Sequence, residues 1–192
     1  MKTETYQLLT RLHRRHGPRE FGKICQKLLA VACRLAGFEH VVERGVQGVD
    51  LDVALLTERY ATEVKTTEKD SVAFQQKDAE GLASRRQDGY QPLLAVLRLS
   101  PFSDWHLVSI EHLRTGNLLI ASLRPYRRRN LEERLTPRFD EGLAAHFDGA
   151  WTDSQSYLDR VLRELGVQVL DTAAIPSVQP CSHAHYLANA NG

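Results

Sequence analysis

Val49-Asp50-Leu51-Asp52-Val53-Ala54-Leu55-Leu56, followed by Arg59-Tyr60-Ala61-Thr62-Glu63-Val64-Lys65, is the stretch that decides the fold of this chain. Both segments are rich in alternating apolar residues and only two residues separate them, so they predict a β-hairpin. Strands that contribute to a core normally exclude charge, but these carry two aspartates, a glutamate and a lysine. Clustered carboxylates beside one lysine are typical of a site for a hard divalent cation and phosphoryl transfer.

The turn of the hairpin determines which charged residues face one another. A two-residue connection at Thr57-Glu58 places Asp52 opposite Glu63 and Asp50 opposite Lys65. Opposed residues lie about 5 Å apart and diagonal ones about 7–8 Å, so either aspartate can share a cation with Glu63. A half-exposed hairpin whose polar face only carries salt bridges shows the same alternation, and the pattern alone leaves both interpretations open.

The segments around the hairpin predict an α/β protein whose mixed β-sheet is flanked by helices. Apolar residues recur at helical spacing over 19–36, and Gly37 ends this helix. The segment 67–71 is predicted to be a polar loop. The other predicted elements are a helix over 3–16, strands over 38–44, 92–97 and 105–109, and a helix over 74–86.

The chain is predicted to divide into a mixed-sheet core over 1–124 and a partly helical C-terminal extension over 125–192. Residues 118–121 read either as a strand or as the start of a helix. In the extension, a helix over 130–147 is interrupted at Pro137.

A further helix of the extension begins near Thr152 or Asp153 and ends at Gly166, and the residues after 171 form an irregular tail. Cys181, His183 and His185 offer metal ligands in this tail. The chain has no second cluster of this kind to complete a site, so we do not expect bound zinc.

The composition is that of an ordinary globular protein, with 42% hydrophobic and 26% charged residues in a chain of 192. No apolar run approaches the roughly 20 residues of a membrane span, and the first residues lack the apolar part of a signal peptide. Three cysteines do not make a disulfide framework, so we expect a cytoplasmic protein. A net charge of +1 excludes no class of partner.

Four segments of the chain occur in an order that is known from one group of enzymes. They are the helix Gly22–Leu29 leading to Gly37-Phe38, the segment Gly48–Ala54, the tetrapeptide Glu63-Val64-Lys65-Thr66, and the helix and strand over Ala79–Leu97. Over roughly residues 19–120 the chain resembles the PD-(D/E)xK nuclease superfamily and, within it, the archaeal-type Holliday junction resolvases. The resemblance implies a restriction-endonuclease-like core that hydrolyses DNA phosphodiester bonds.

The resemblance also implies a role for each matching residue. Asp50 and Glu63 would hold Mg²⁺, for which Mn²⁺ substitutes, and the carbonyl of Val64 would be a third ligand. Lys65 would be the catalytic lysine that assists the attacking water. Asp52 is the rival of Asp50: the two-residue turn favours Asp52, whereas the family spacing favours Asp50 and requires a bulge. We choose Asp50.

Two positions depart from the pattern of the family. Gln26 stands on the first helix where family members usually have glutamate, and its amide oxygen can bind a metal or its water but brings no negative charge. Glu20 lies six residues earlier, about 240° around the helix, and would substitute only if the helix begins later than expected. The second departure is Val49, which stands where the name of the motif has proline.

DNA, branched or junction DNA above all, is the partner that the resemblance implies, and a resolvase that cuts two strands symmetrically is expected to be a homodimer. Solvated surface charge is the alternative explanation for each basic residue in the chain. The predicted contacts to DNA phosphates are Arg14, Arg15, Lys69, Gln75 and Arg85.

The function predicted from these residues is that of a metal-dependent DNA endonuclease, closest to the junction resolvases. A restriction-type or repair-type duplex endonuclease would share the same catalytic face. A non-catalytic DNA-binding protein of the same fold is the alternative from a different class, because Gln26 removes one charge from the metal site. A nuclease that acts on RNA is a weaker alternative.

Overall fold

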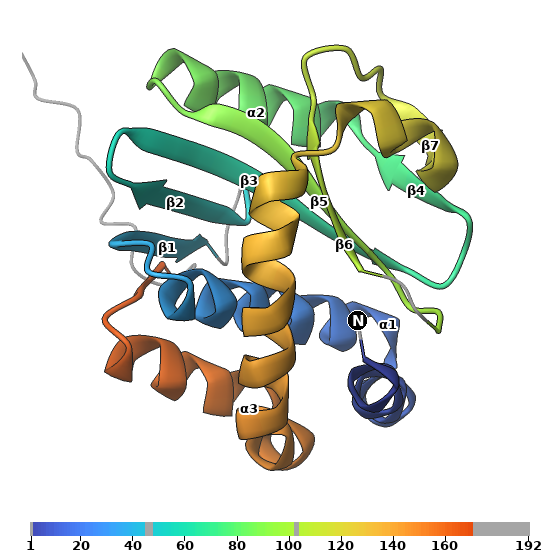
Figure 1. Ribbon diagram of the computed structural model, residues 1–192, viewed down its shortest axis with the longest axis vertical. Coiled ribbons are helices and arrows are strands. Elements are labelled where there is room, and N and C mark those ends of the chain that lie inside the picture. The colour runs from blue at the N-terminus through green and yellow to red at the C-terminus, as the bar shows by residue number, and fades with distance from the viewer. Residues whose placement is uncertain (1, 45–47, 102–103, 171–192) are drawn as a thin grey trace, which may run out of the picture.

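The computed structural model describes residues 2–44, 48–101 and 104–170, and its core is a six-stranded sheet of order β6-β5-β3-β2-β1-β8 (Figure 1). The pairs β3–β5 and β1–β8 are parallel and the remaining neighbours are antiparallel. The mixed-sheet α/β architecture predicted from the sequence is therefore confirmed. The strands are β1 (His40–Arg44), β2 (Leu51–Leu55), β3 (Glu58–Thr67), β5 (Gln91–Arg98), β6 (Trp105–Ser109) and β8 (Gln168–Leu170).

Helices cover both faces of this sheet. The long helices α1 (Thr3–Leu35) and α3 (Arg129–Glu164) pack against each other on one face, and α2 (Gln76–Gln87) covers the opposite face (Figure 1). Each long helix is bent at one residue. Gly17 has φ 77° in α1, and Ser154 has φ 52° in α3. Across the described ranges, every helix is too short or too polar to traverse a lipid bilayer.

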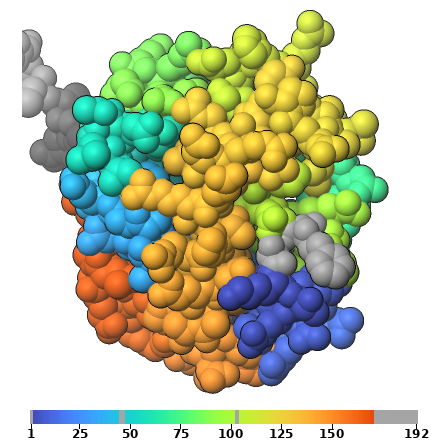
Figure 2. All heavy atoms as spheres, in the orientation of Figure 1, coloured from blue at the N-terminus to red at the C-terminus, as the bar shows by residue number. Residues whose placement is uncertain are grey.

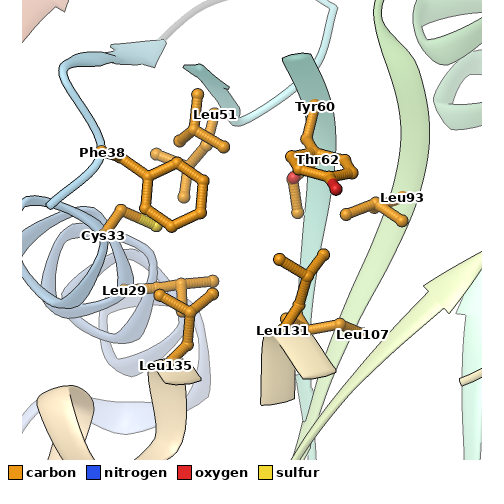
Figure 3. A pocket seen from close by; sticks show the side chains of 11 residues that line it. Leu29, Cys33, Phe38, Leu51, Tyr60, Thr62, Leu93, Leu107, Leu131 and Leu135 are labelled. Atoms are coloured by element: carbon orange, nitrogen blue, oxygen red, sulfur yellow. The ribbon is translucent and has the colours of Figure 1, made fainter. Parts of the chain in front are cut away.

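The apolar core between the sheet and the two long helices is closely packed. Figure 3 looks into it, where Leu29 and Cys33 of α1 and Leu131 and Leu135 of α3 surround a cavity of about 20 Å³ below the sheet. This volume has room for about one water molecule, and its lining is almost entirely apolar. The cavity is a small packing defect, and the candidate chemistry lies elsewhere.

Residues 125–170 share this core with the preceding residues. Phe139 of α3 packs edge-on against Trp105 of β6 with ring centroids 5.3 Å apart, and β8 pairs with β1. Figure 2 shows α3, in orange, crossing one face of the molecule and meeting the blue N-terminal part of α1. The predicted division at residue 124 is therefore not a structural boundary among the described residues, because α3 supplies side chains that cover the sheet.

Helix α3 also departs from the predicted interruption at Pro137, since it continues through this residue to the bend at Ser154. Pro137 is the ninth residue of α3 and cannot donate to the carbonyl four residues earlier, but the backbone keeps helical dihedral angles through it. The predicted irregular tail with Cys181, His183 and His185 lies outside the described residues.

The predicted hairpin is present, but its turn lies one residue earlier than expected. Leu55 pairs with Glu58, so the turn consists of Leu56 and Thr57, and Leu56 has φ 53°. Moving a turn by one residue moves the register by two, and the predicted pairing of Asp52 with Glu63 is therefore wrong.

The observed register runs through the pair Leu51–Thr62, with Asp52 opposite Ala61. Asp50 comes directly before Leu51 in the chain and lies beside Glu63. The N–H of Asp50 donates to the carbonyl of Thr62, which already pairs with Leu51, so the ladder is irregular at Asp50 in the manner of a bulge, as the family spacing required.

A small second sheet was not predicted. β4 (Ser71–Phe74) and β7 (Gly116–Leu119) pair antiparallel, and a 3₁₀ helix, η1 (Ile120–Tyr126), follows β7 directly. Most of the predicted polar loop over 67–71 is the short connection from β3 to β4. The small sheet therefore begins a few residues after Lys65 and forms a wall next to it.

Candidate active site

Asp50 and Glu63 form the centre of the candidate site. The backbone N–H of Asp50 donates to the Thr62 carbonyl at 3.1 Å, and Oδ2 of Asp50 accepts the backbone N–H of Val64 at 2.8 Å. These two bonds fix the aspartate against β3, directly beside Glu63. The side chains of Asp50 and Glu63 are only 17% and 8% exposed, so water screens their mutual repulsion poorly.

Burial has a large effect on both of these acids. It raises the pKa of Glu63 to about 7, and the neighbouring Asp50 charge adds to this increase. Burial also raises the pKa of Asp50, although Lys23 and the Val64 N–H oppose the change. Two adjacent carboxyl groups that hold protons more tightly than usual are suited to a divalent cation, because its charge removes their repulsion.

Lys65 extends the cluster toward α2. Its Nζ donates to Oε1 of Glu63 at 2.7 Å and lies 2.9 Å from Oδ2 of Asp78. The same Asp78 oxygen accepts the backbone N–H of Gln75 and so stabilises the first turn of α2. Burial lowers the pKa of Lys65, but Glu63 and Asp78 outweigh it and the net change is upward. Lys65 is therefore a charged ammonium held between two carboxylates.

Two residues of α1 complete the cluster from the other side. Nζ of Lys23 lies 3.5 Å from Oδ1 of Asp50 and donates to Oε1 of Gln26 at 2.8 Å. Nε2 of Gln26 donates to Oε1 of Glu43 at 2.6 Å and, over 3.2 and 3.3 Å, to the carbonyls of Arg44 and Asp50. The amide nitrogen therefore faces β1, and the amide oxygen faces the Lys23 ammonium that also contacts Asp50.

The donor set fits a small, hard cation such as Mg²⁺. It consists of the carboxylates of Asp50 and Glu63 and the amide oxygen of Gln26. The N–H and C=O of one strand residue point to the same side, so the Val64 carbonyl is also directed toward the edge where Asp50 lies. Within the described ranges no three His, Cys, Asp or Glu side chains form a complete metal cage, and Mg²⁺ typically takes one or two carboxylates with several waters.

Asp52, the rival ligand, lies outside the cluster. It is fully buried and accepts hydrogen bonds from Nε of Arg44 at 2.7 Å and from two nitrogens of Arg85 at 3.1 and 2.8 Å. Arg85 also packs over the ring of Tyr90, with its guanidinium carbon 4.2 Å from the ring centroid. Asp52 and Arg85 therefore form an internal ion pair. Arg85 was predicted to contact DNA, but its guanidinium is engaged in this pair.

Glu20, the other alternative ligand, also lies away from Asp50. Its carboxylate accepts hydrogen bonds from the hydroxyl of Ser154 and from Nε2 of Gln155, the latter at 2.6 Å. Both partners belong to α3. Burial raises the pKa of Glu20, but the hydrogen bonds from Ser154 and Gln155 outweigh it and the net change is downward. Glu20 thus joins the two long helices and is not brought to the candidate metal position.

Two of the predicted DNA contacts share a groove with Lys65. The groove has a volume of about 490 Å³ and runs along the end of β3, β4 and the start of α2. Lys65, Lys69 and Lys77 line it together with Gln75 and Asn117. Three ammonium groups and neutral hydrogen-bonding side chains provide a surface suited to phosphate groups.

The two arginines predicted to bind DNA near the N-terminus lie on the first part of α1. Arg14 is exposed, whereas the guanidinium of Arg15 lies 5.6 Å from the ring centroid of Trp151 in α3. Neither residue lines the groove that begins at Lys65.

A close contact between two glycines places the segment that carries Asp50. A Cβ atom at Gly81 of α2 would lie 3.0 Å from the carbonyl carbon of Gly48 and 3.1 Å from its oxygen. Real Cβ atoms rarely come this close to backbone atoms, so α2 can pack directly on the segment before Asp50 only because residue 81 has no side chain.

Sequence reasoning missed three members of the cluster, which are Lys23, Glu43 and Asp78. A signal existed for Glu43, because it is a charged residue next to two valines in a predicted strand. Asp78 stands three residues after Gln75, which is the spacing of a capping pair. Lys23 has no such signal, since its role depends on how α1 is rotated against the sheet.

Comparison with known proteins found one kind of similarity. No protein-family model and no curated protein matches the chain. Among solved structures, the chain is similar to Hjc from Archaeoglobus fulgidus, a Holliday junction resolvase from an archaeal hyperthermophile, with 15% sequence identity and a TM-score of 0.43. The match covers 52% of this chain and 84% of the other. The chemistry of this chain has to be inferred from its own residues.

Proposed function

We propose that this chain is a metal-dependent nuclease that hydrolyses phosphodiester bonds in DNA. The observation that supports this most strongly is the cluster of Asp50, Glu63 and Lys65, in which two buried carboxylates lie side by side and the lysine donates to one of them at 2.7 Å. These are the residues that match the motif of the PD-(D/E)xK nucleases. Paired carboxylates with an adjacent ammonium are suited to metal-assisted phosphoryl transfer.

In this proposal Asp50 and Glu63 hold Mg²⁺, with the oxygens of Gln26 and Val64 as further donors. The bound ion would supply a water of lowered pKa and would polarise a phosphoryl oxygen. The N–H of Val64 holds one oxygen of Asp50 at 2.8 Å, which keeps this carboxylate from rotating away from Glu63. Burial of both acids keeps their charges effective, because little water is present to screen them.

Lys65 acts as a positive charge and not as a base. Its pKa is raised by Glu63 and Asp78 in spite of burial, so the amine carries its proton at neutral pH. A protonated amine can donate to the attacking water or to a phosphoryl oxygen on which negative charge develops. The two carboxylates that hold Lys65 determine where this charge is placed.

DNA is the proposed substrate, and the groove beyond Lys65 is the proposed path of one strand. Lys69 and Lys77 would contact phosphates on one side of the bond that is cleaved. Among DNA substrates we place the four-way junction first, because the sequence segments resemble those of the archaeal-type resolvases most closely. Two symmetric cuts in a junction would require two copies of the chain, so the proposal includes a homodimer.

Cleavage of a labelled four-way junction and of a matched duplex tests this proposal. Wild type, Glu63→Gln and the control Glu58→Gln, an exposed position on the same strand, are compared in Mg²⁺ and in Mn²⁺. Paired nicks on the junction, lost in Glu63→Gln and kept in the control, are expected. Equal cutting of the duplex would indicate a restriction-type or repair-type endonuclease. Absence of cutting on both substrates would contradict the nuclease proposal.

A specific observation favours one second candidate, a DNA-binding protein of this fold without catalysis. Ammonium groups already lie next to both carboxylates, with Lys23 at 3.5 Å from Asp50 and Lys65 at 2.7 Å from Glu63, and Gln26 adds no negative charge. Such a cluster could stabilise itself without a cation. This candidate predicts DNA binding that is unchanged when EDTA removes all divalent metal.

A further inference from the structure

We infer that Glu43 is a positioning residue for the candidate metal site and that it acts through Gln26. The inference rests on the proposed function, since it assigns a role toward the metal held by Asp50 and Glu63. Glu43 lies in β1 and is fully buried, opposite Leu51 of β2.

The two oxygens of Glu43 have different partners. Oε1 accepts from Nε2 of Gln26 at 2.6 Å, and Oε2 accepts from Nζ of Lys27 at 3.1 Å. Lys27 also donates to Asp159 of α3 at 2.6 Å. The ion pairs through Lys27 join α1 to β1 and to α3, which is a structural task. The bond to Gln26 also joins α1 to β1, but it is the one that leads toward the cluster, because the other end of the Gln26 amide accepts from Lys23 beside Asp50.

Glu43 determines which end of the Gln26 amide faces the cluster. Glu43 is paired with the Lys27 ammonium at 3.1 Å, and a carboxylate in such a pair only accepts hydrogen bonds, so it requires the NH₂ end of the Gln26 amide. The carbonyls of Arg44 and Asp50 lie around the same nitrogen at 3.2 and 3.3 Å and impose the same requirement. The amide oxygen must therefore point to the opposite side, where it accepts from Lys23 beside Asp50.

The bond from Gln26 to a buried carboxylate also changes the amide oxygen. A negative charge at the NH₂ end polarises the amide and makes its oxygen a better acceptor and a better metal ligand. The arrangement resembles in principle a metal-bound histidine whose second nitrogen donates to a carboxylate. In this chain an amide lies on the helix and an acid lies behind it on β1, and together they supply a neutral but more strongly polarised oxygen at the helix position.

Exchange of the amide and the acid tests the inference. In Glu43→Gln, Lys27 retains the oxygen of the introduced amide, so two NH₂ groups meet and the Gln26 oxygen loses its orientation. We expect this variant to bind Mn²⁺ about 10- to 100-fold more weakly. In Gln26→Glu two carboxylates meet, and we expect lowered stability. The double variant restores one donor opposite one acceptor, and we expect it to bind Mn²⁺ at least as tightly as wild type.

The readout is the Mn²⁺ affinity of metal-free protein, measured by electron paramagnetic resonance on samples whose folding is checked by circular dichroism. Asp159→Asn is the structural control, because it weakens the Lys27 ion pairs without touching Gln26, and we expect its Mn²⁺ affinity within about twofold of wild type. The NMR signal of the Gln26 side-chain amide should also shift when Mg²⁺ is added to wild type.

The outcomes separate this inference from the proposed function. If wild type binds Mn²⁺ and Asp50→Asn does not, the metal site exists as proposed. Unchanged affinity in folded Glu43→Gln, or a Gln26 signal that Mg²⁺ leaves in place, would then overturn the role of Glu43 alone. If Glu43→Gln does not fold, the double variant is used in its place. A double variant that binds Mn²⁺ no more tightly than Gln26→Glu alone would overturn the role of Glu43. A wild type that binds no Mn²⁺ would overturn both.

Discussion

Asp50 and Asp52 are two residues apart and are both largely buried, but they have different neighbours: Asp50 lies beside a second carboxyl group as well as Lys23, whereas Asp52 pairs only with arginines. Asp52 is surrounded by the guanidinium groups of Arg44 and Arg85, which donate to it over 2.7 to 3.1 Å. Asp50 lies beside the carboxyl group of Glu63, and burial together with this proximity raises the pKa of Glu63 to about 7. The first aspartate has the neutralising charge it needs within the chain, and the second leaves a position for a cation.

The largest expected effect comes from changing each aspartate to asparagine. Asp50→Asn should reduce DNA cleavage by about 10³-fold or more, because the loss of a metal ligand removes several kcal/mol of transition-state stabilisation. Asp52→Asn should lower the free energy of unfolding by about 3 kcal/mol and leave the cleavage rate of the folded fraction within a few-fold. Single-turnover cleavage and urea denaturation measure the two quantities, and a folded Asp52→Asn that cuts as poorly as Asp50→Asn would remove the distinction.

A similar contrast is expected between Lys65 and Arg85, the cations on the two sides. Lys65→Met should reduce the single-turnover rate at saturating Mg²⁺ by about 10²- to 10³-fold, because the variant loses charge stabilisation in the transition state. Arg85→Met should lower stability and leave this rate within a few-fold, since Arg85 pairs with Asp52. If Lys65→Met keeps its rate, the lysine is only a structural partner of Glu63 and Asp78.

Stability should depend on pH through Glu63. Because the folded-state pKa of Glu63 is about 7 and its ordinary value is 4.5, the folded state binds this proton more tightly than the unfolded state. The contribution is complete below about pH 4.5 and is lost as pH rises through 7, by about 3 kcal/mol at most. Urea denaturation in EDTA at pH 5.5 and pH 8 measures the loss.

Two controls sharpen the pH experiment. Glu63→Gln should flatten the dependence, and Asp52→Asn should retain it on a lower baseline. Saturating Mg²⁺ should also flatten it, because the ion stabilises the ionised carboxylates of the folded state. The same slope in wild type and Glu63→Gln would show that another group is responsible.

The smallest effect is expected from the lysines of the groove beside Lys65, which belongs to the Asp50 cluster and not to the Asp52 ion pair. Lys69→Ala and Lys77→Ala should each weaken DNA binding a few-fold and reduce the slope of affinity against salt by about one. Fluorescence anisotropy with Glu63→Gln protein, which should not cut, measures binding from 50 to 200 mM salt, concentrations typical for such titrations. Arg160→Ala on α3 serves as the exposed control, and equal losses there would indicate non-specific attraction.

Sequence patterns predicted the parts of the fold that are long and periodic, such as the hairpin and the strand β5. β4 escapes prediction because it has four residues and stands among polar ones, whereas residues 118–121, which read as a strand or a helix start, contain the end of β7 and the start of η1. The register of the hairpin differs because Leu56 adopts φ 53°, a conformation that non-glycine residues rarely take and that pattern reasoning does not assign to leucine.

Of the candidate site, Asp50, Glu63, Lys65 and Gln26 were predicted, whereas Lys23, Glu43 and Asp78 were missed. Glu63 and Lys65 follow from the pattern of the hairpin, whereas the choice of Asp50 over Asp52 and the position of Gln26 came from the resemblance to the nuclease family. Lys23 and Asp78 come from α1 and α2, and the rotation of each helix against the sheet depends on packing across the whole core. Sequence periodicity says which face of a helix is apolar, but not which polar residue at its border reaches the cluster.

Because Gly81 packs directly on Gly48, α2 contacts both the segment that carries Asp50 and the side chain of Lys65. The helix touches the segment before Asp50 at Gly81, and one turn earlier its Asp78 holds Lys65 at 2.9 Å. Lys77 of the same helix lines the groove proposed for DNA. If the proposed function holds, a DNA strand bound at Lys77 would contact the same helix that places Asp78 beside Lys65 and that packs on the segment before Asp50.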